Sequence, residues 1–268
     1  MSNDPTVTKQ IIKSYWTNKD RKAMTAKEHN RVMLEFYPAE IMAAVNNSKI
    51  YGYPQSMPTP VNNVGQPEQI FVNKDSISAL CDIYDKNKNI CVLNFASYKH
   101  PGGGFMYGSS AQEESLCHET TLYEILSSKR FEDYYLWNNA HKNRGLYTNR
   151  AIYSPGIIVE HDDNCFTTTI LTCAAPNFGA AGQYKMATPT ENFDTLAARV
   201  QFIADILEEN NIDTFIAGAF GCGVFGQNPN ELVTIYKSVN WGSHMKKIIH
   251  AVPGTGENTD VFKAAFGG

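Results

Sequence analysis

Glu113 and Glu114 are adjacent carboxylic acids that follow a run of three glycines, Gly102–Gly104, at short distance. Glycine permits positive φ and lets backbone N–H groups approach a ligand closely, and Gly108 extends that freedom along the same segment. Gln112 and the two acids stand where the next helix is expected to begin. Paired carboxyl groups beside such a loop could supply general-acid catalysis. The alternative is a flexible loop whose acids only complement a helix dipole.

A second glycine-rich segment, GCGVFGQNP, contains Gly221, Gly223 and Gly226 in the dinucleotide-binding pattern G-x-G-x-x-G. In a Rossmann site the third glycine lies inside the helix and an acidic residue follows about 20 residues later. Here the helix is expected to start only at Pro229, and lysines stand at the place of the acid. The Rossmann interpretation therefore fails. What remains is a glycine-rich turn at a helix N-terminus, which could bind a diphosphate.

Three aromatic side chains lie within these two segments. Phe225 could lie flat against a sugar or a base. Phe105 and Tyr107 have no evident packing partner in the sequence, so they could cover a bound ligand.

Other reactive side chains have structural explanations. Cys222 lies between two glycines, as a nucleophile could, but the sequence places no base beside it, and close packing is the preferred interpretation. Cys117 and His118 are neighbours that point apart on a helix. The run His161–Asp163 could suggest a metal, yet a solvated turn after the strand IIVE is favoured. We therefore expect no metal and no cofactor, because no Cys/His/Asp/Glu cluster has ligand spacing.

Alternating strand and helix patterns surround the two glycine-rich segments, each of which follows an apolar strand. Ligands of open α/β sheets bind beyond the carboxyl ends of such strands. The alternation predicts an α/β fold in which helices sandwich a mostly parallel or mixed sheet. Strands are expected at 69–73, 90–96, 151–154, 157–160, 167–175, 214–220 and 247–253. Helices are expected at 8–47, 76–85, 113–128, 131–139, 193–210 and 229–238. Pro38 should break the first helix, Asp75 should cap the second, and residues 51–69 should form an extended connection.

Bulk composition narrows the class of protein. The 268 residues, of which 43% are hydrophobic, suit one large domain or one domain with an added helical segment. A net charge of −4 argues against a general nucleic-acid binder, which needs a surplus of Lys and Arg. No apolar run approaches the ~20 residues of a membrane span, and the start lacks the apolar core of a signal peptide. With six scattered cysteines and no C-x-x-C pair, we expect an intracellular, cytoplasmic protein, or a nuclear one in a eukaryote, without structural zinc or membrane contact.

The segment LNFASYKHPGGGFMYGSSAQEESLCHETTLY resembles the signature of microbial-type poly(ADP-ribose) glycohydrolases (PARGs), in which three glycines are followed at short distance by Q-E-E. IYSPGIIV, LTCAAPN and GAFGCGVFGQNP are similar to later segments of that family, in the same order. The resemblance covers roughly residues 70–253, and the first ~50 residues are less distinctive. It implies a macrodomain-like core over residues 69–268, with residues 1–68 as a helical N-terminal extension packed on it in one structural unit.

The resemblance also implies roles for individual residues. Glu114 would be the catalytic acid, and Glu113 would position a ribose hydroxyl. Asn94 would face the terminal ribose. The other implied ligand-binding positions are Gly102, Gly103, Gly104 and Gln112 in the first segment and Gly221, Gly223, Val224, Phe225 and Gly226 in the second, which would wrap a diphosphate.

The two acids suit the cleavage of a ribose–ribose O-glycosidic bond, which needs its leaving oxygen protonated. A helix N-terminus lowers a carboxyl pKa by under one unit, whereas a second carboxylate ~5 Å away raises it by over two units at an effective dielectric of ~20. Repulsion between Glu113 and Glu114 is therefore expected to keep one of them protonated. Neighbouring helical residues differ by ~100° in direction and cannot easily flank one bond. We thus expect one acid, one orienting residue and a water activated partly by the substrate phosphate.

The expected activity is hydrolysis of poly(ADP-ribose), with the polymer or an ADP-ribosylated protein as partner and ADP-ribose as product. A hydrolase that removes single ADP-ribose units from protein side chains or nucleic acid would use the same pocket. A reader that binds ADP-ribose without cleaving it is a further alternative, which two acids near an anionic ligand disfavour. Three departures from the family pattern, His118, Glu119 and Gln227, could alter substrate preference.

Overall fold

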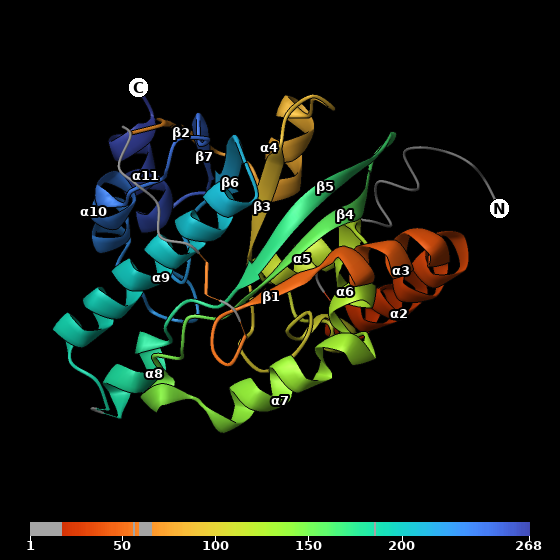
Figure 1. The fold of residues 1–268 in the computed structure, drawn as a ribbon, viewed down its shortest axis with the longest axis horizontal. Coiled ribbons are helices and arrows are strands. Elements are labelled where there is room, and N and C mark those ends of the chain that lie inside the picture. The colour runs from red at the N-terminus through yellow and green to blue at the C-terminus, as the bar shows by residue number, and fades with distance from the viewer. Residues whose placement is uncertain (1–17, 56, 59–65, 185) are drawn as a thin grey trace.

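A seven-stranded mixed sheet forms the centre of the molecule (Figure 1). The structure is a computed structural model that describes residues 18–55, 57–58, 66–184 and 186–268. Its strand order is β1-β4-β5-β3-β6-β7-β2, in which the β1–β4 and β4–β5 pairs are antiparallel and all other pairs are parallel. The strands are β1 (Lys49–Tyr51), β2 (Glu68–Val72), β3 (Ile90–Phe95), β4 (Ala151–His161), β5 (Asn164–Cys173), β6 (Thr214–Ala217) and β7 (Lys247–Ala251).

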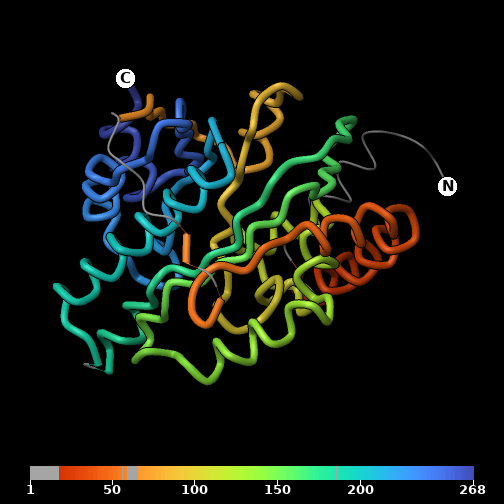
Figure 2. The backbone as a smooth tube through the Cα atoms, viewed as in Figure 1, coloured from red at the N-terminus to blue at the C-terminus, as the bar shows by residue number. Residues whose placement is uncertain are grey.

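Helices cover both faces of the sheet, and the N-terminal and C-terminal helices lie at opposite ends of the molecule (Figures 1 and 2). One hydrophobic core lies between the sheet and α9 (Pro189–Glu209), α10 (Pro229–Ser238) and α11 (Glu257–Phe266). The other lies on the opposite face. The helices that contribute to it are α2 (Lys19–Phe36), α3 (Pro38–Asn47), α4 (Ser76–Ile83), α5 (Gln112–Glu119), α6 (Leu122–Leu126) and α7 (Glu132–Ala140).

Strand β3 shows why the sheet needs both layers. Successive side chains of a strand point to opposite faces. Cys91 and Leu93 accordingly lie in the core under α9, whereas Ile90 and Val92 lie in the core under α4. All four are almost fully buried. The continuous apolar run that predicts a strand buried on both faces is therefore confirmed.

Several boundaries agree with the sequence-based predictions. Helix α10 covers the predicted residues, and Asp75 caps α4 by accepting a hydrogen bond of 2.9 Å from the Ser78 N–H. The predicted break at Pro38 separates α2 from α3. The part of the predicted N-terminal helix before residue 18 lies outside the described residues, as does part of the predicted connection over residues 51–69.

One predicted helix, over residues 113–128, is wrong because the chain breaks at Thr120 and Thr121 between α5 and α6. Thr120 forms an isolated bridge with Val159 of β4, and the Thr121 N–H donates to the Ile158 carbonyl at 3.1 Å. The two threonines have low helix propensity, so their hydrogen bonds to β4 end the helix here. The consequence is that α5 is a short helix fixed at both of its ends.

Strand β4 is also longer than predicted. The expected pair of short strands is one strand with a bulge between Ser154 and Ile157, at the Pro155–Gly156 dipeptide. The elements that the sequence patterns did not indicate are β1, α8 (Phe178–Gln183), α11 and the short 3-10 helices η1 (Phe105–Tyr107), η2 (Lys129–Phe131) and η3 (Asn143–Gly145).

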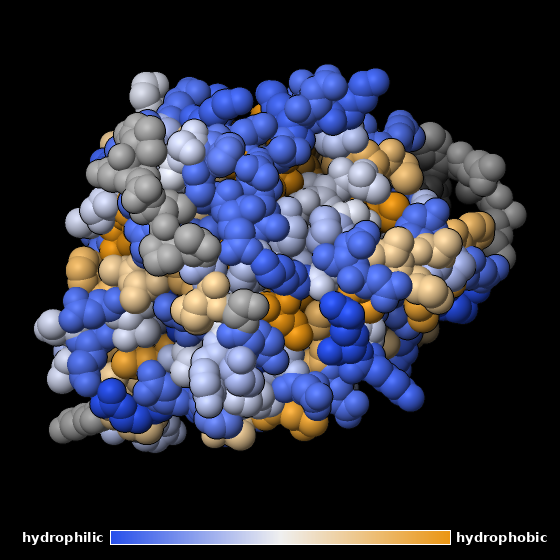
Figure 3. Space-filling model, viewed as in Figure 1, coloured by the Kyte–Doolittle hydropathy of each residue, from blue (hydrophilic) through white to orange (hydrophobic). Residues whose placement is uncertain are grey.

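Polar residues cover most of the face shown in Figure 3, and apolar residues form separate patches, one of them over α2 and α3. Exposed apolar side chains on these helices include Leu34, Phe36 and Met42. Within the described ranges, no helix combines the length and the apolar character needed to cross a lipid bilayer.

Candidate active site

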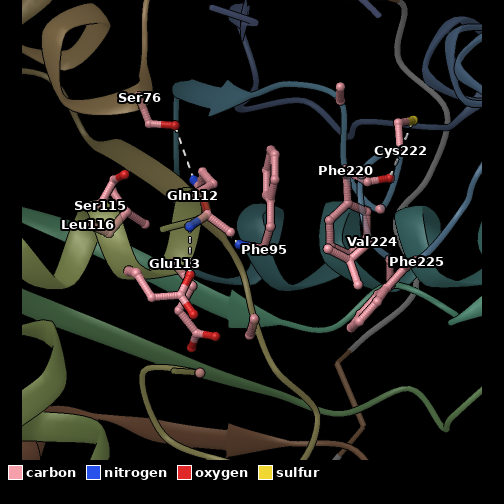
Figure 4. A pocket seen from close by; sticks show the side chains of 18 of the residues that line it. Ser76, Phe95, Gln112, Glu113, Ser115, Leu116, Phe220, Cys222, Val224 and Phe225 are labelled. Carbon is pink, nitrogen blue, oxygen red and sulfur yellow. Dashed lines mark hydrogen bonds between the residues drawn. The ribbon is translucent and has the colours of Figure 1, made fainter. Parts of the chain in front are cut away.

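Two loops follow neighbouring parallel strands and border one cleft of about 940 Å³ (Figure 4). We call residues 96–111, after β3, the first glycine loop. Residues 218–228, after β6, are the second glycine loop. Both lie at the carboxyl edge of the sheet, as expected for a ligand site of an α/β fold.

Gln112, the first residue of α5, ties the helix to β3. Its Oε1 accepts a hydrogen bond of 2.8 Å from the Phe95 N–H, and its Nε2 donates to the Leu93 carbonyl at 2.7 Å. Nε2 also donates to Ser76 Oγ at 3.1 Å, the bond drawn in Figure 4. The side chain lines the cleft, but these hydrogen bonds all go to the protein. Gln112 therefore fixes where α5 begins.

Glu113 is the more enclosed of the two acids, with 3% of its surface exposed. Its Oε2 accepts a hydrogen bond of 2.7 Å from the Ser97 N–H, and its Oε1 accepts one of 3.2 Å from Asn94 Nδ2. Asn94 Nδ2 also donates to Thr172 Oγ1 at 3.3 Å, so β3 and β5 jointly position the amide. Asn94 Oδ1 is buried and accepts no hydrogen bond from any described residue.

Glu114 points back over the first glycine loop. Its Oε1 accepts a hydrogen bond of 2.7 Å from the Gly104 N–H, and its Oε2 accepts one of 2.9 Å from the Ala111 N–H. The second bond satisfies one of the backbone donors that the start of α5 leaves without a helical partner. Glu114 is 7% exposed and lines the cleft beside Glu113.

Gly103 lies between the two carboxyl groups and has a φ of +58°. A Cβ at this position would stand 2.6 Å from Glu114 Oε1 and 2.9 Å from Glu113 Oε2. The Glu113 and Glu114 oxygens are therefore at most about 5.5 Å apart, because both distances are measured from the same Cβ position. The close approach of the backbone to both acids thus requires glycine. Structure and sequence agree that the glycine run and the two acids form one site.

Burial raises the pKa of Glu113 to about 8, and the charge of Glu114 adds to the rise. The hydrogen bonds from Ser97 and Asn94 act in the opposite direction. The cause differs from the sequence-based expectation, because burial, and not repulsion between the acids, contributes most to the rise. A raised pKa at Glu113 fits the expectation that one of the two acids stays protonated.

The second glycine loop is fixed at its base and open at its tip. Gly221 has a φ of +80°, and a Cβ there would stand 2.7 Å from Ala175 Cβ. Gly226 has a φ of +67° and lies against Gly179, whose N–H donates to the Phe225 carbonyl at 2.8 Å. Gly223, at the tip, differs from both, because its φ lies outside the left-handed region and a Cβ there would meet no atom within 4 Å.

Gln227 anchors this loop from below. It is 3% exposed, and its Nε2 donates to the Pro176 carbonyl at 2.6 Å. Its amide also pairs reciprocally with the Asn192 amide of α9, at 2.8 and 2.9 Å. The Gln227 N–H closes the loop on the Gly221 carbonyl at 3.1 Å. The departure noted in the sequence therefore lies beneath the loop and does not line the cleft.

Aromatic side chains connect the two loops along one wall of the cleft. Tyr98 and Tyr147 stack with ring centroids 4.0 Å apart and planes 10° from parallel, and the Tyr147 ring meets Phe225 edge-on at 6.1 Å. Asn177 lines the cleft beside them. The sequence analysis missed Tyr98, Tyr147 and Asn177, because no spacing rule links positions so far apart in the chain.

Phe105 does not cover the cleft, so that expectation is wrong. It is fully buried in η1, where it packs edge-on against His29 of α2 at 6.2 Å and against His118 at 4.7 Å. The packing partner comes from the N-terminal helix, which loop composition cannot indicate. Tyr107 is 75% exposed and does not line the cleft.

The structural explanations of the other reactive residues fit the geometry. Burial raises the pKa of the Cys222 thiol to about 12, so the thiol lacks the ionised form that a nucleophile needs. Asp162 and Asp163 form the exposed turn between β4 and β5, while His161 pairs with Glu119. In the part of the chain that the structure describes, no group of three His, Cys, Asp or Glu side chains gathers as metal ligands.

Comparisons with known proteins identify a family and similar folds. The family model described as "Microbial-type PARG, catalytic domain" matches residues 16–162. The structure of PARG from Thermomonospora curvata is similar over 92% of this chain and 98% of that chain, at 24% identity and a TM-score of 0.80. PARG from Deinococcus radiodurans in complex with ADP-ribose matches over 84% of this chain and 96% of that chain, at 25% identity and a TM-score of 0.73. A search of curated proteins finds no match.

The fold and the paired acids define a glycoside hydrolase on a macrodomain-like α/β fold. The chain belongs to the microbial-type PARG family, since the family model covers more than half of its residues. It is accordingly an enzyme of the poly(ADP-ribose) glycohydrolase type.

Proposed function

We propose that this enzyme hydrolyses the ribose–ribose O-glycosidic bonds of poly(ADP-ribose) and releases ADP-ribose. The observation that carries the proposal is the convergence of Glu113 and Glu114 on Gly103, at one end of a cleft whose other side is the second glycine loop. A ligand with a sugar at one end and a diphosphate in its middle suits that cleft.

ADP-ribose then lies across both loops. The terminal ribose faces Asn94, Glu113 and Glu114, and the diphosphate lies against the backbone of Gly221–Phe225 and Gly226. Backbone N–H groups of a glycine-rich turn bind phosphate oxygens without any net positive charge, which matches an enzyme of net charge −4. The Deinococcus radiodurans relative, solved with ADP-ribose, supports this choice of ligand.

In the proposed mechanism Glu114 protonates the leaving oxygen as the C–O bond to the terminal ribose breaks. A water then adds to the oxocarbenium-like carbon and returns its proton to Glu114. Burial raises the pKa of Glu113, so Glu113 holds a proton in the free enzyme. Transfer of that proton to Glu114 supplies the acid, and the Glu113 carboxylate then accepts a hydrogen bond from a ribose hydroxyl. The negative charge of the substrate diphosphate further favours the protonated form of Glu113.

The experiment compares two substrates, poly(ADP-ribose) and a mono-ADP-ribosylated protein, after gel filtration in EDTA. Chromatography of the products should show ADP-ribose released from the polymer by the metal-stripped enzyme. Release from the mono-ADP-ribosylated protein alone would contradict the proposed substrate. Activity that returns only with added magnesium or zinc would contradict the metal-free mechanism.

A further inference from the structure

Tyr147 is a bulky residue in a backbone conformation that normally favours glycine. Its φ is +62°, and its side chain is 5% exposed. For a tyrosine this left-handed conformation costs conformational energy, and it persists only where the surroundings hold it. Such residues gather at ligand sites, and Tyr147 lines the cleft between the two glycine loops.

Two polar side chains, one exposed and one buried, hold this segment in place. Asn143 Nδ2 donates to the Tyr147 carbonyl at 3.1 Å. The Arg199 guanidinium of α9, which is fully buried, donates to the Leu146 carbonyl at 3.4 Å and to the Ala174 carbonyl at the end of β5. The buried guanidinium thus joins the backbone next to Tyr147 to the backbone directly after β5.

Tyr98 and Tyr147 form one wall of the cleft and belong to neither of the two large hydrophobic cores. Tyr147, Tyr98 and Ala174 form a small cluster of their own, apart from the two cores on either face of the sheet. The cluster reaches from the first glycine loop, through Tyr98, to Phe225 of the second. Burial raises the pKa of the Tyr147 hydroxyl, and the side chain of Asn177 beside it acts in the opposite direction.

We propose, on the basis of the function proposed above, that Tyr147 and Asn177 line the subsite of the terminal ribose. That ribose must span the distance from the acids, where its glycosidic bond breaks, to the second glycine loop, where its diphosphate lies. Tyr147 occupies the wall between these two points. Its ring offers an apolar surface to the sugar carbons. The Asn177 Oδ1 caps α8 by accepting from the Ala180 N–H at 3.1 Å, which fixes the amide so that its Nδ2 can donate to a ribose hydroxyl.

The test uses Tyr147→Leu, which removes the planar ring and the hydroxyl but fills much of the volume. Calorimetry measures its affinity for ADP-ribose and for ADP, which lacks the terminal ribose. We expect ADP-ribose to bind roughly tenfold more weakly and ADP to change by about twofold or less. Equal losses for the two ligands, or no loss for either, would overturn the assignment.

Tyr153→Leu is the matched control, because Tyr153 is a half-buried tyrosine on β4 that does not line the cleft. It should lower the Tm without changing either affinity. If Tyr147→Leu fails to fold, Tyr147→Phe keeps the ring but removes the hydroxyl that hydrogen-bonds the Asn177 side chain, and it must still weaken ADP-ribose binding more than ADP binding. Failure of the wild-type enzyme to bind ADP-ribose would contradict the proposed function itself. If the wild-type enzyme binds ADP-ribose normally but a folded Tyr147 variant loses equal affinity for ADP-ribose and ADP, only the role of Tyr147 is rejected and the proposed function stands.

Discussion

The two glycine loops border the same cleft but are built differently (Figure 4). In the first, backbone and carboxyl groups contact one another so closely that a Cβ at Gly103 would stand under 3 Å from both acids. In the second, the base is held by Gln227, while Val224 at the tip is 87% exposed and Gly223 has open space around it. The bond-breaking end is therefore preorganised by the protein, whereas the diphosphate end leaves the tip of its loop, at Gly223 and Val224, open to the ligand.

The largest effect expected from this comparison is at the acid. Glu114→Gln should lower kcat by about 10²–10⁴-fold, because the amide cannot deliver a proton, while ADP-ribose binding changes little. The amide also cannot accept from both the Gly104 and Ala111 N–H groups, so some loss of stability is expected. A release assay, calorimetry and thermal unfolding separate these effects. Turnover close to that of the wild type would remove Glu114 from the mechanism.

The second effect is on stability. Because the pKa of Glu113 is raised from 4.5 to about 8, the folded state binds more protons than the unfolded state between these values. The protonated Glu113 therefore contributes roughly 2–5 kcal/mol to the free energy of unfolding. This contribution is fully present below pH 4.5 and is lost as the pH rises through 8. Glu113→Gln, which mimics the protonated form, should lack this loss. Urea unfolding of both proteins at pH 5 and about pH 8.5 measures it. Parallel behaviour of the two proteins would show that Glu113 does not titrate in this range.

A matched pair of glycine substitutions tests the difference between the loops. Gly103→Ala should cost about 2–3 kcal/mol of folding stability and most of the activity, since a Cβ meets both acids at a φ of +58°. Gly223→Ala should change stability by under about 0.5 kcal/mol, because its Cβ meets no atom within 4 Å. Denaturant midpoints and turnover give both values. Equal costs at the two positions would mean that the loops do not differ in preorganisation.

The smallest effect is at the aromatic side of the second loop. Phe225→Ala should weaken ADP-ribose binding by about 1–3 kcal/mol, by analogy with base–aromatic stacking, without a comparable loss of kcat. Val224→Ala in the same loop is the control, since that side chain is 87% exposed and makes few contacts. Calorimetry of both variants measures the difference. A larger effect at Val224 than at Phe225 would indicate that the loop presents its other side to the ligand.

Local patterns predicted the elements that carry the site. Apolar runs indicated β3 and β6, and Asp75 and Pro229 marked the starts of α4 and α10. The proximity of the glycine run to Glu113 and Glu114 followed from their places after β3. These signals act over a few residues, which is why the sequence alone contained them.

The remaining features depend on distant contacts. The break after α5 follows from the pairing of Thr120 with Val159, and the burial of Phe105 depends on His29. The raised pKa of Glu113 comes mainly from burial, which no sequence spacing specifies. Repulsion between neighbouring acids could be worked out beforehand, but desolvation required the packed structure.

Gly108, at the C-terminal end of η1, determines which substitutions are possible where η1 contacts the N-terminal helix α2. It has a φ of +74°, and a Cβ there would stand 2.0 Å from the main-chain carbonyl oxygen of Lys19, in the first turn of α2. The contact is therefore with a backbone atom that every amino acid carries, so side-chain substitutions along α2 leave the contact unchanged. Any side chain at position 108 would clash with that atom, so the position requires glycine. For this reason we propose that residues 1–68, in the part that the structure describes, and residues 69–268 form one unit. The side chains of the helices before β1 can then be substituted while the backbone contact with the catalytic loop stays the same.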